Sequence, residues 1–486
     1  MASLEELRDE RLKKKALLQE RGFDPYPNES HRTGTIEVFL DRFSLYESGK
    51  DVVTIAGRIM SKRGQGAITF CDIFDGTART QILLKADEMD KDLYELFAET
   101  IDVGDFIEAT GTAYMTQRGQ QSLFIQGWRM LSKSLRPIPD SWFGIEDTEE
   151  KLRRRYLDIL QDSAVADMVK KRSVFWNTMR SFLLAQDFIE VETPVLENTT
   201  GGADARPFIT HHNALDMDVF LRISAGELWQ KKLMIAGIPR TFEIGRIFRN
   251  EGMSPEHLQD YTQMEFYMAY SDYIKGMEMI KALYREVAEK TFNTTTFTIK
   301  GFTVDLASEW AMYDFCALIR EHYDVDPLAT TVADVESALK KHDLEYDKAT
   351  LSIERGVDLL WKKIRKGLAG PGFLVNVPVY LEPLAKKNRD GSETVERFQV
   401  ILAGSEVGKG FSELNDPVDQ RERFLKQQAL RDAGDDEAQM ADMEYVEAME
   451  YGMPPAFGFG VSERLFSFLL DKPVRETQIF PLMRPK

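Results

Sequence analysis

TFEIGRIFRNEG, residues 241–252, and YTQMEFYMAY, residues 261–270, are two neighbouring runs in which polar and apolar side chains alternate. This period of two predicts β-strands, because successive side chains of a strand point to opposite faces. In the second run Gln263, Glu265 and Tyr267 share one face, and the residues between them are apolar. The two runs therefore predict an antiparallel pair with one apolar face and one polar face that lines a site.

Arg249 stands at the end of the first predicted strand, just before a polar loop. A guanidinium in this place can hold a phosphate or a carboxylate through two parallel hydrogen bonds. The loop carries Glu251, Gly252, His257 and Asp260, so the strand pair could close over a ligand. A surface hairpin with an ordinary ion pair would show the same pattern, and the residues alone leave both interpretations open.

A second segment, SEVGKGFSELND at residues 405–416, contains two glutamates with suggestive spacing. If Lys409 and Gly410 are the turn residues of a hairpin, Glu406 and Glu413 lie directly opposite each other. Facing carboxylates repel unless a cation neutralises them, and Mg²⁺ often bridges carboxylates to phosphate groups. The spacing predicts a Mg²⁺ site, with two exposed glutamates that tolerate each other as the alternative.

PPAFGFGVSERLF at residues 454–466 combines two glycines with the start of a helix. Gly458 and Gly460 let another group approach the backbone closely. Ser462 is the predicted N-cap of the helix, and Arg464 falls in its first turn. A basic residue there opposes the helix dipole unless an anion binds nearby, although a merely exposed arginine is a simpler interpretation.

The segment ENTTGGADARPFITHHNALDMDVFLRISAGELWQKKL covers residues 197–233. Gly201 and Gly202 permit unusual backbone geometry or the close approach of another group. Glu227 precedes an apolar helical stretch, where an acidic residue is also favoured by the helix dipole alone.

The N-terminal part predicts a different architecture. Residues 3–21 read as a helix, with Ser3 and Glu6 as a capping box. Five strand-like runs follow, with a helix predicted for residues 87–99 between the third and the fourth. The runs are VVTIAGRIM, AITFCDIF, ARTQILL, DFIEATGTAYM and SLFIQGWRML. This order fits a five-stranded OB β-barrel, a common platform for single-stranded nucleic acid, although a generic small barrel would share it.

The composition of the 486 residues narrows the class of protein. Apolar residues make up 43%, enough to build the cores of two or three domains. Apolar runs such as residues 373–381 are too short to span a bilayer, and the first residues do not resemble a signal peptide. A cytoplasmic protein without membrane contact is therefore expected. Cys71 and Cys316 form neither a disulfide framework nor a zinc site, so any metal should be a hard cation held by carboxylates.

The net charge of −18 argues, taken alone, against a nucleic-acid partner. Binding needs only a local basic patch, however, and residues 11–15 and 153–155 are two candidates. Taken alone, each of them is more simply explained as a solvated helix face.

The segments together resemble the class II aminoacyl-tRNA synthetases. FRNEG with the following aromatic-Thr strand resembles their motif 2, and GFGVSERLF resembles their motif 3. DFIEVETP, which ends at Pro194, resembles motif 1, the dimer interface of that family. Closer similarity to the lysyl-tRNA synthetases is carried by GGADARPFITHHNALDMD, GFSELNDP, AGDDEA and IFPLMRPK. The similarity covers nearly the whole chain.

The resemblance implies an α+β fold: an N-terminal five-stranded OB β-barrel and a class II catalytic domain, an antiparallel sheet flanked by helices. The implied domains are a helical extension (1–50), an anticodon-binding OB domain (51–135), a linker (136–150) and a catalytic domain (151–486). A helical region is expected to be inserted around residues 270–370.

The resemblance also assigns site residues by position. Arg249 and Arg464 are expected to be catalytic, and Glu406 and Glu413 to bind Mg²⁺. The ATP site would comprise Arg249, Glu251, His257, Tyr261, Glu406, Glu413 and Arg464. The lysine pocket would comprise Gly202, Glu227, Glu265, Tyr267 and Asn415, and the anticodon site Lys62, Arg63, Phe70 and Gln81. Carboxylates in a pocket select a cationic side chain, because a buried charge without a partner is costly.

The implied function is a lysine–tRNA ligase, a homodimer that activates lysine with ATP to lysyl-adenylate and transfers it to the 3′ end of tRNA(Lys). A related class II synthetase for aspartate or asparagine is an alternative, but Glu227 and Glu265 would repel an anionic side chain. A non-catalytic paralogue and an enzyme that attaches lysine to protein are the others. The sequence departs from the family at residues 257–261 (HLQDY), in GVSER of motif 3 and in SAGEL before the predicted helix.

Overall fold

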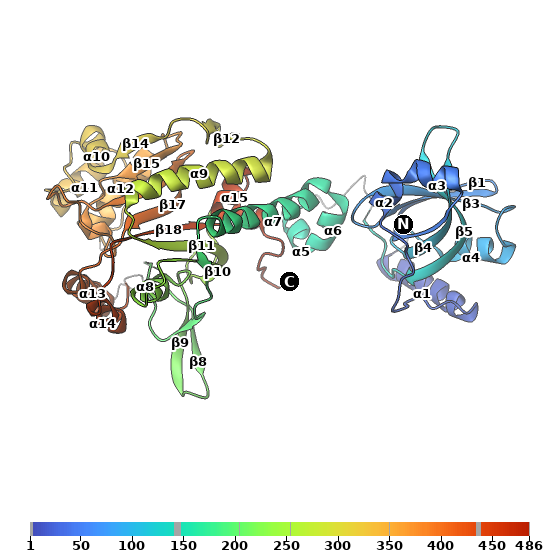
Figure 1. The fold of residues 1–486 in the computed structure, drawn as a ribbon, viewed down its shortest axis with the longest axis horizontal. Coiled ribbons are helices and arrows are strands. Elements are labelled where there is room, and N and C mark those ends of the chain that lie inside the picture. The colour runs from blue at the N-terminus through green and yellow to red at the C-terminus, as the bar shows by residue number, and fades with distance from the viewer. Residues whose placement is uncertain are drawn as a thin grey trace. The chain divides into compact units, whose positions relative to one another are not determined.

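The structure is a computed structural model, and it describes residues 3–139, 147–203, 205–252, 254–348, 350–433 and 439–485. The chain divides into two compact units, Met1–Lys151 and Leu152–Lys486 (Figure 1). Residues 140–146 of the predicted linker and residues 434–438 of the AGDDEA segment lie outside the described residues. Among the residues that the structure describes, no helix combines the length and the apolar composition needed to cross a bilayer.

The first unit is a closed five-stranded barrel with strand order β1-β2-β3-β5-β4, which confirms the predicted OB fold. Its strands are β1 (Val52–Gln65), β2 (Ile68–Phe74), β3 (Arg79–Lys85), β4 (Phe106–Met115) and β5 (Gln121–Ser132). Its helices are α1 (Leu4–Glu20), α2 (Ile36–Asp41), α3 (Phe43–Gly49) and α4 (Lys91–Thr100). The barrel encloses a core of apolar side chains from alternate strand positions, among them Ile73, Ile82 and Ile107.

Helix α1 starts as the sequence predicts. The Ser3 hydroxyl accepts from the Glu6 amide at 3.1 Å, and the Glu6 carboxylate accepts from the Ser3 amide at 2.6 Å. These two bonds satisfy donors that the first turn of a helix leaves without intrahelical partners. The predicted capping box is therefore confirmed.

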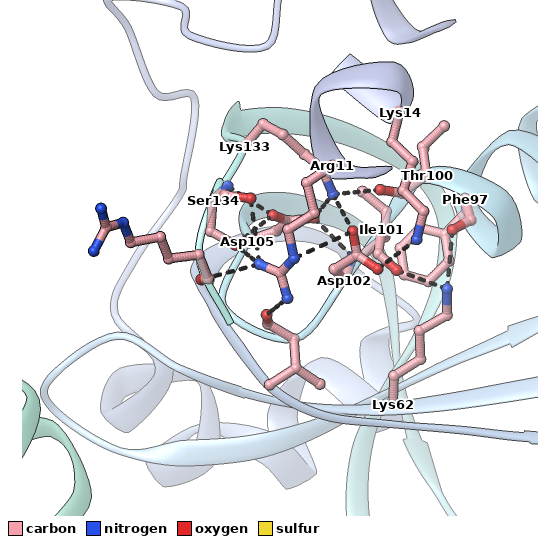
Figure 2. Close-up of polar contacts among 12 residues, drawn as sticks. Arg11, Lys14, Lys62, Phe97, Thr100, Ile101, Asp102, Asp105, Lys133 and Ser134 are labelled. Atoms are coloured by element: carbon pink, nitrogen blue, oxygen red, sulfur yellow. Dashed lines mark hydrogen bonds and ion pairs between the residues drawn. The ribbon is translucent and has the colours of Figure 1, made fainter. Parts of the chain in front are cut away.

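A charge cluster of five side chains ties α1 to the barrel (Figure 2). We call it the barrel cluster: Arg11, Lys14, Asp102, Asp105 and Lys133. The Lys133 ammonium, fully buried, lies 2.6 Å from Asp102 and 2.7 Å from Asp105, and Lys14 lies 2.6 Å from Asp102. Arg11 donates to the Val103 carbonyl at 3.0 Å. Two cations of the basic patch predicted at residues 11–15 are thus bound internally, and they do not form a free phosphate-binding surface.

The second unit is built on an eight-stranded sheet with order β14-β15-β16-β17-β18-β11-β10-β6. The pairs are antiparallel except β14–β15 and β10–β6. The strands are β6 (Ile189–Glu190), β10 (Arg240–Phe248), β11 (Asp260–Ala269), β14 (Ala311–Asp314), β15 (Gly372–Val375), β16 (Arg397–Leu402), β17 (Ser405–Ser412) and β18 (Ala456–Ser462). Two small sheets join β7 (Leu196–Glu197), β9 (Met217–Leu221) and β8 (Ile209–His212), and β12 (Thr296–Ile299) with β13 (Phe302–Asp305).

Helices surround this sheet, as the expected α+β class requires (Figure 1). They are α5 (Thr148–Arg153), α6 (Arg155–Gln161), α7 (Ser163–Leu184), α8 (Glu227–Ile235), α9 (Tyr273–Phe292), α10 (Phe315–Tyr323), α11 (Val332–Lys341), α12 (Ile353–Arg365), α13 (Pro417–Asp432), α14 (Met443–Glu450) and α15 (Arg464–Leu469). Two short 3₁₀ turns, η1 (Val379–Leu381) and η2 (Val474–Thr477), complete the unit. The region expected as an insertion, around 270–370, contains α9 to α12 and the small β12–β13 hairpin.

One face of the large sheet packs against α9, which in turn packs against α7. Phenylalanines from three strands pack in this layer: Phe266 lies 5.7 Å from Phe459, and Phe398 lies 5.8 Å from Phe457, centroid to centroid. Burying such a side chain contributes about 1.5–3 kcal/mol. The apolar face of the sheet is committed to the core, so the opposite face is the one available for a site.

The hairpin predicted with Lys409 and Gly410 as its turn is wrong. Residues 405–412 form the single strand β17, which pairs with β16 on one side and β18 on the other. The turn lies between β16 and β17, at Ala403 and Gly404, whose φ angles are +44° and +72°. Because both neighbours of β17 satisfy its backbone groups, nothing favours a turn within the strand.

Candidate active site

Side chains line up in two rows across the face of the large sheet opposite α9, because paired residues of adjacent strands share a face. One row runs through Glu243, Glu265, Gly460, Lys409 and Gln399, and the other through Thr241, Tyr267, Gly458, Phe411 and Arg397. The two β18 glycines in the middle leave space above the sheet. At Gly458 a Cβ would stand 2.5 Å from the Tyr267 ring, so glycine is required for the strands to approach.

A cavity of about 450 Å³ lies over these glycines. It is bounded by nine of the twelve residues that the resemblance assigned to the ATP, lysine and Mg²⁺ sites, and these nine come from four distant segments. They are Gly202, Glu227, Arg249, His257, Tyr261, Glu265, Tyr267, Glu406 and Arg464. Glu251, Glu413 and Asn415 are not in its lining. The strand pair β10–β11 and its polar loop therefore do border a ligand-sized space, as the hairpin with a polar face suggested.

Glu265 is a buried carboxylate with donors on both oxygens. One oxygen accepts from the Ala225 amide at 2.8 Å and from the Gln263 side chain, and the other accepts from the Tyr267 hydroxyl at 2.9 Å. Burial, with the charge of Glu227, raises the pKa of Glu265 although these donors oppose the rise. A ligand cation would reverse the penalty, so Glu265 is suited to hold an ammonium group.

Glu227 is the first residue of α8 and faces the glycine pair. Gly202 has a φ of +86°, and a Cβ there would stand 2.7 Å from the Cβ of Glu227. At Gly201 a Cβ would stand 2.6 Å from Leu228. The close approach that the sequence predicted at this glycine pair is therefore real, and it brings the segment before β8 against the start of α8.

Lys231 lies one turn after Glu227 on α8 and is 1% exposed. Its ammonium is 2.6 Å from Glu227 Oε1 and forms a second ion pair with Glu413. The rings of Tyr267 and Phe411 lie 5.5 and 5.4 Å away. Burial alone would lower the pKa of Lys231, but the two carboxylates raise it overall, so this side chain is a permanent cation.

Arg249 is half-buried at the end of β10. Its Nε donates to the Ile223 carbonyl at 3.3 Å, and its guanidinium lies 5.9 Å from the centre of the Tyr261 ring. Burial raises the pKa of Tyr261, so its ring is neutral and suited to stacking. Arg249 and Tyr261 thus offer a cation and an aromatic face on one side of the cavity.

Arg464 forms an ion pair with Glu256, a residue of the β10–β11 loop that the sequence did not single out. Glu256 also lies 2.5 Å from the Lys300 ammonium. Burial would raise the pKa of Glu256, but Arg464 and Lys300 lower it overall, so the carboxylate is ionised. Partial burial and the charge of Arg464 lower the pKa of His257. The Glu256 carboxylate is therefore bound to Arg464, the arginine that is expected to bind a phosphate group.

Ser462 is not the N-cap that the sequence predicted. Helix α15 begins at Arg464, so the N-cap position is Glu463, whose carboxylate pairs with Arg172 and accepts from Gln478. The Ser462 hydroxyl accepts from the Arg464 amide at 3.3 Å. Because the glutamate is bound elsewhere, the start of the helix is left with this one local contact from Ser462.

Comparisons with known proteins assign the sequence to a family. Residues 147–484 match the model of class II tRNA synthetases (D, K and N), and residues 53–131 match the OB-fold nucleic acid binding domain. The chain is 40% identical to a lysine–tRNA ligase of Roseiflexus sp. (strain RS-1), over 99% of both chains. The chain belongs to the lysine–tRNA ligase family of class II tRNA synthetases.

Two other lysine–tRNA ligases are similar to this chain over nearly its whole length. Identity to a lysine–tRNA ligase of Thermosipho africanus is 39%, and to that of Thermotoga maritima 37%, in each case over 99% of this chain and 97% of the relative. The chain thus spans both parts of these ligases. Family membership confirms the predicted fold class and the class of enzyme.

The two glutamates that the resemblance assigned to Mg²⁺ are each paired with a cation of the chain in this structure. Glu406 accepts from Trp361 Nε1 at 2.7 Å with one oxygen and pairs with Arg365 at 2.8 Å through the other. Glu413 is 1% exposed and pairs with Lys231. In the described ranges no group of three or more His, Cys, Asp or Glu side chains could hold a metal ion. Each carboxylate already has a cation of the chain as its partner.

Asn415 lies away from the cavity. Its side-chain oxygen accepts from Lys386 Nζ at 2.6 Å, and its side-chain nitrogen donates to the Met453 carbonyl at 3.2 Å. Both groups are used in joining the start of α13 to neighbouring loops. The structure therefore does not bring Asn415 together with the other residues predicted for the lysine pocket.

In the OB domain the structure separates Lys62 from the other three predicted anticodon residues. Arg63 pairs directly with Phe70, and Gln81 pairs with Asp72, so Arg63, Phe70 and Gln81 share the outer face of the barrel. Lys62 points the other way, where its ammonium donates to carbonyls at the end of α4, at 2.7 Å for Ala98. Lys62 thus caps a helix, which leaves the outer face to the other three.

The sequence missed several residues of this site. Lys231 could have been found, because it lies four residues after Glu227 and such pairs share a helix face. Glu256 and Arg365 carried no local signal: the Glu256–Arg464 pair joins residues 208 positions apart. Contacts of this kind depend on the tertiary fold.

Proposed function

We propose that this chain is a lysine–tRNA ligase, which activates lysine with ATP to lysyl-adenylate and then transfers the lysyl group to the 3′ end of tRNA(Lys). Support comes from family membership, from the lysine-specific names of its relatives and from the charges of the cavity. The charge pattern of the cavity is the observation that supports lysine as the amino acid.

Within the described residues, Glu227 and Glu265 line the cavity, and the ion pairs of Lys231 with Glu227 and Glu413 lie behind them, so that three carboxylates and one ammonium form one group. With all four ionised, their charges sum to −2; burial raises the pKa of Glu413 to about 8 and also raises the pKa of Glu265, so a ligand cation would favour their ionised forms. Free lysine carries two ammonium groups, so lysine fills this deficit. An aspartate or asparagine side chain brings no cation, and buried unpaired charges disfavour it by several kcal/mol.

The substrate carboxylate, once the two ammonium groups are held, points toward the cationic end of the cavity. We assign Arg249 to that carboxylate and the α-phosphate, Tyr261 to one face of the adenine, and Arg464 to its other face and the terminal phosphate. Glu251 and His257 of the β10–β11 loop would border the nucleotide. For Arg464 to serve, Glu256 must leave its guanidinium.

The reaction then needs positioning and charge stabilisation rather than a covalent enzyme intermediate. The lysine carboxylate oxygen attacks the α-phosphorus, the bond to the β-phosphate oxygen breaks, and pyrophosphate leaves. A terminal ribose hydroxyl of the tRNA attacks the acyl carbon, and AMP leaves. Arg249 stabilises the negative charge that develops on the α-phosphoryl oxygens.

Magnesium stays part of the proposal only as an ion that arrives with ATP. Bound to the phosphates, it would neutralise part of their charge. Glu406 lines the cavity and is the carboxylate that such an ion would meet after Arg365 moves. Glu413, the second carboxylate that the resemblance assigned to Mg²⁺, would serve as a ligand only after Lys231 releases it.

The OB barrel is proposed to bind the anticodon on its outer face. Phe70 is half-buried and can stack on a base, Arg63 is exposed and can meet phosphate, and Gln81 lies between strands β2 and β5. Stacking on aromatic side chains of such a sheet is the usual way to hold unpaired bases. The domain limits 1–50, 51–135, 136–150 and 151–486 are proposed on the same basis.

A homodimer and a cytoplasmic location complete the proposal. Strand β6, in the segment that resembles motif 1, is the edge of the large sheet, and Ile189, Leu184 and Leu196 near it are exposed. An uncovered sheet edge with apolar side chains favours pairing with a second chain. Sedimentation equilibrium would report the mass of the assembly.

Amino-acid-dependent ATP–pyrophosphate exchange across all twenty amino acids tests the function. We expect lysine alone to support rapid exchange, and tRNA(Lys) to become lysylated. Exchange with aspartate or asparagine would point to the related synthetases. Lysine exchange without tRNA charging would favour a protein-lysylating enzyme, and no exchange with any amino acid a non-catalytic paralogue.

A further inference from the structure

Lys231 does not line the cavity itself, but it lies directly behind Glu227, which does, and the function proposed above uses only its charge. A lysine that is 1% exposed is costly to bury unless its charge is compensated on all sides. Its compensation comes from Glu227 and Glu413, and from the electron-rich faces of Tyr267 and Phe411. Two carboxylates and two aromatic faces around one buried position favour a cationic side chain there over a neutral one.

The ion pairs also fix the carboxylates. Lys231 holds Oε1 of Glu227, and the other oxygen, Oε2, is the one that a Cβ at Gly202 would meet at 3.0 Å. Gly202 lines the cavity, so Oε2 is directed to the side from which substrate enters. Within the described residues Lys231 is the ion-pair partner of Glu413. One ammonium thus orients two glutamates.

We propose that Lys231 is the positioning residue that aims Glu227 at the substrate and sets the charge deficit of the pocket to two, so that a dicationic amino acid is selected. This inference rests on the proposed function. Without Lys231, Glu227 and Glu413 repel each other and move apart, and the acceptor presented to the lysine side chain is lost.

The test uses the full-length Lys231→Ala and Lys231→Arg variants in lysine-dependent pyrophosphate exchange. Removing one member of a buried ion pair usually has a large effect, so we expect the KM for lysine to rise roughly 10²-fold in Lys231→Ala. The KM for ATP should stay within about threefold, because the nucleotide end keeps its contacts. Lys231→Arg, which keeps the charge, should recover a large part of the loss.

Chemical rescue by propylammonium distinguishes a positioning role of the Lys231 charge from a merely structural role. It matches the atoms that Lys231→Ala removes, so it should restore exchange by that variant in a saturable way. Propanol, equal in shape but uncharged, should not. In the unchanged enzyme propylammonium should only compete with lysine.

Lys232→Ala is the matched control. Lys232 is the next residue on α8, pairs with Asp442 at 3.7 Å and does not line the cavity. Its loss should leave the KM for lysine within about twofold, as for surface ion pairs. Thermal unfolding of each variant shows whether it is folded, and if Lys231→Ala is not, Lys231→Gln takes its place.

Three results would overturn the inference: equal changes in the KM for lysine and for ATP, a tighter KM for lysine in the variant, or rescue by propanol as well as by propylammonium. Each can be told apart from failure of the proposed function. If the unchanged enzyme shows no lysine-dependent exchange, the function itself is wrong. If it does, and Lys231→Ala exchanges normally, only the role of Lys231 falls.

Discussion

Two fully buried lysines, Lys133 in the barrel and Lys231 in the catalytic unit, have opposite charge surroundings. Lys133 shares Asp102 with Arg11 and Lys14 and also pairs with Asp105, so three cations meet two carboxylates (Figure 2). Lys231 is one cation among three carboxylates. The first group is complete and holds α1 in place. The second lacks cations, and this deficit marks a site for a charged ligand.

From this comparison we expect the substitution of Lys133 to have the largest effect on the stability of the fold. Lys133→Met leaves Asp102 and Asp105 buried without their main cation, which should cost about 3–5 kcal/mol. Hydrogen–deuterium exchange of peptides from α1 and β5 in the full chain should accelerate strongly. Lysine-dependent pyrophosphate exchange should be unchanged, since the reaction is assigned to the other unit. Loss of exchange in a folded variant would break the comparison.

Arg249→Ala should have the largest effect on catalysis. The arginine meets the charge that develops on the α-phosphate, and losing one such donor lowers rates by roughly 10²–10³-fold. The hydrogen bond from its side chain to the Ile223 carbonyl is long, at 3.3 Å, so the thermal midpoint should move by less than about 2 °C. Near-normal exchange in this variant would remove Arg249 from the reaction.

Glu265→Gln sharpens the comparison by reducing the deficit from two charges to one. The amide keeps the size of the side chain but no longer attracts an ammonium. We expect the KM for lysine to rise about 10- to 100-fold, equivalent to about 1.4–2.8 kcal/mol, with little change for ATP. Equal effects on the two substrates would place Glu265 outside the pocket.

Acid should weaken the barrel cluster by a smaller amount. Burial alone would raise the pKa of Asp102, but Lys133 and Lys14 lower it overall. A carboxyl whose pKa is lower in the folded chain than in the unfolded chain stabilises the fold above the unfolded value of about 3.9. That contribution disappears as the pH falls through the folded pKa, so amide exchange in α1 should quicken below about pH 4. Asp102→Asn should lack this step.

The parts of the fold that follow a local rule could be predicted from the sequence. The five barrel strands and the polar face of β11 follow from a period of two, and the α1 capping box from the spacing of Ser3 and Glu6. The turn before β17 was misplaced because Lys409–Gly410 resembles a turn as closely as Ala403–Gly404 does. Neighbouring strands decided between them.

The candidate site was predictable where one segment carried the information. Nine of the residues singled out border one cavity. The ion-pair partners of those residues were not predictable, because Arg365 meets Glu406 and Glu256 meets Arg464 only after the chain has folded. Asn415 lies in a motif shared with the family, yet its side chain joins two loops instead.

The Glu256–Arg464 ion pair would affect which nucleotides can bind in the cavity. A triphosphate brings enough negative charge to displace the Glu256 carboxylate, which can stay with Lys300 when Arg464 turns away. Adenosine or AMP lacks that terminal charge and leaves the pair closed. Under the proposed role of Arg464, the Glu256 carboxylate would compete with the terminal phosphate for the same guanidinium and could rebind it when the nucleotide leaves.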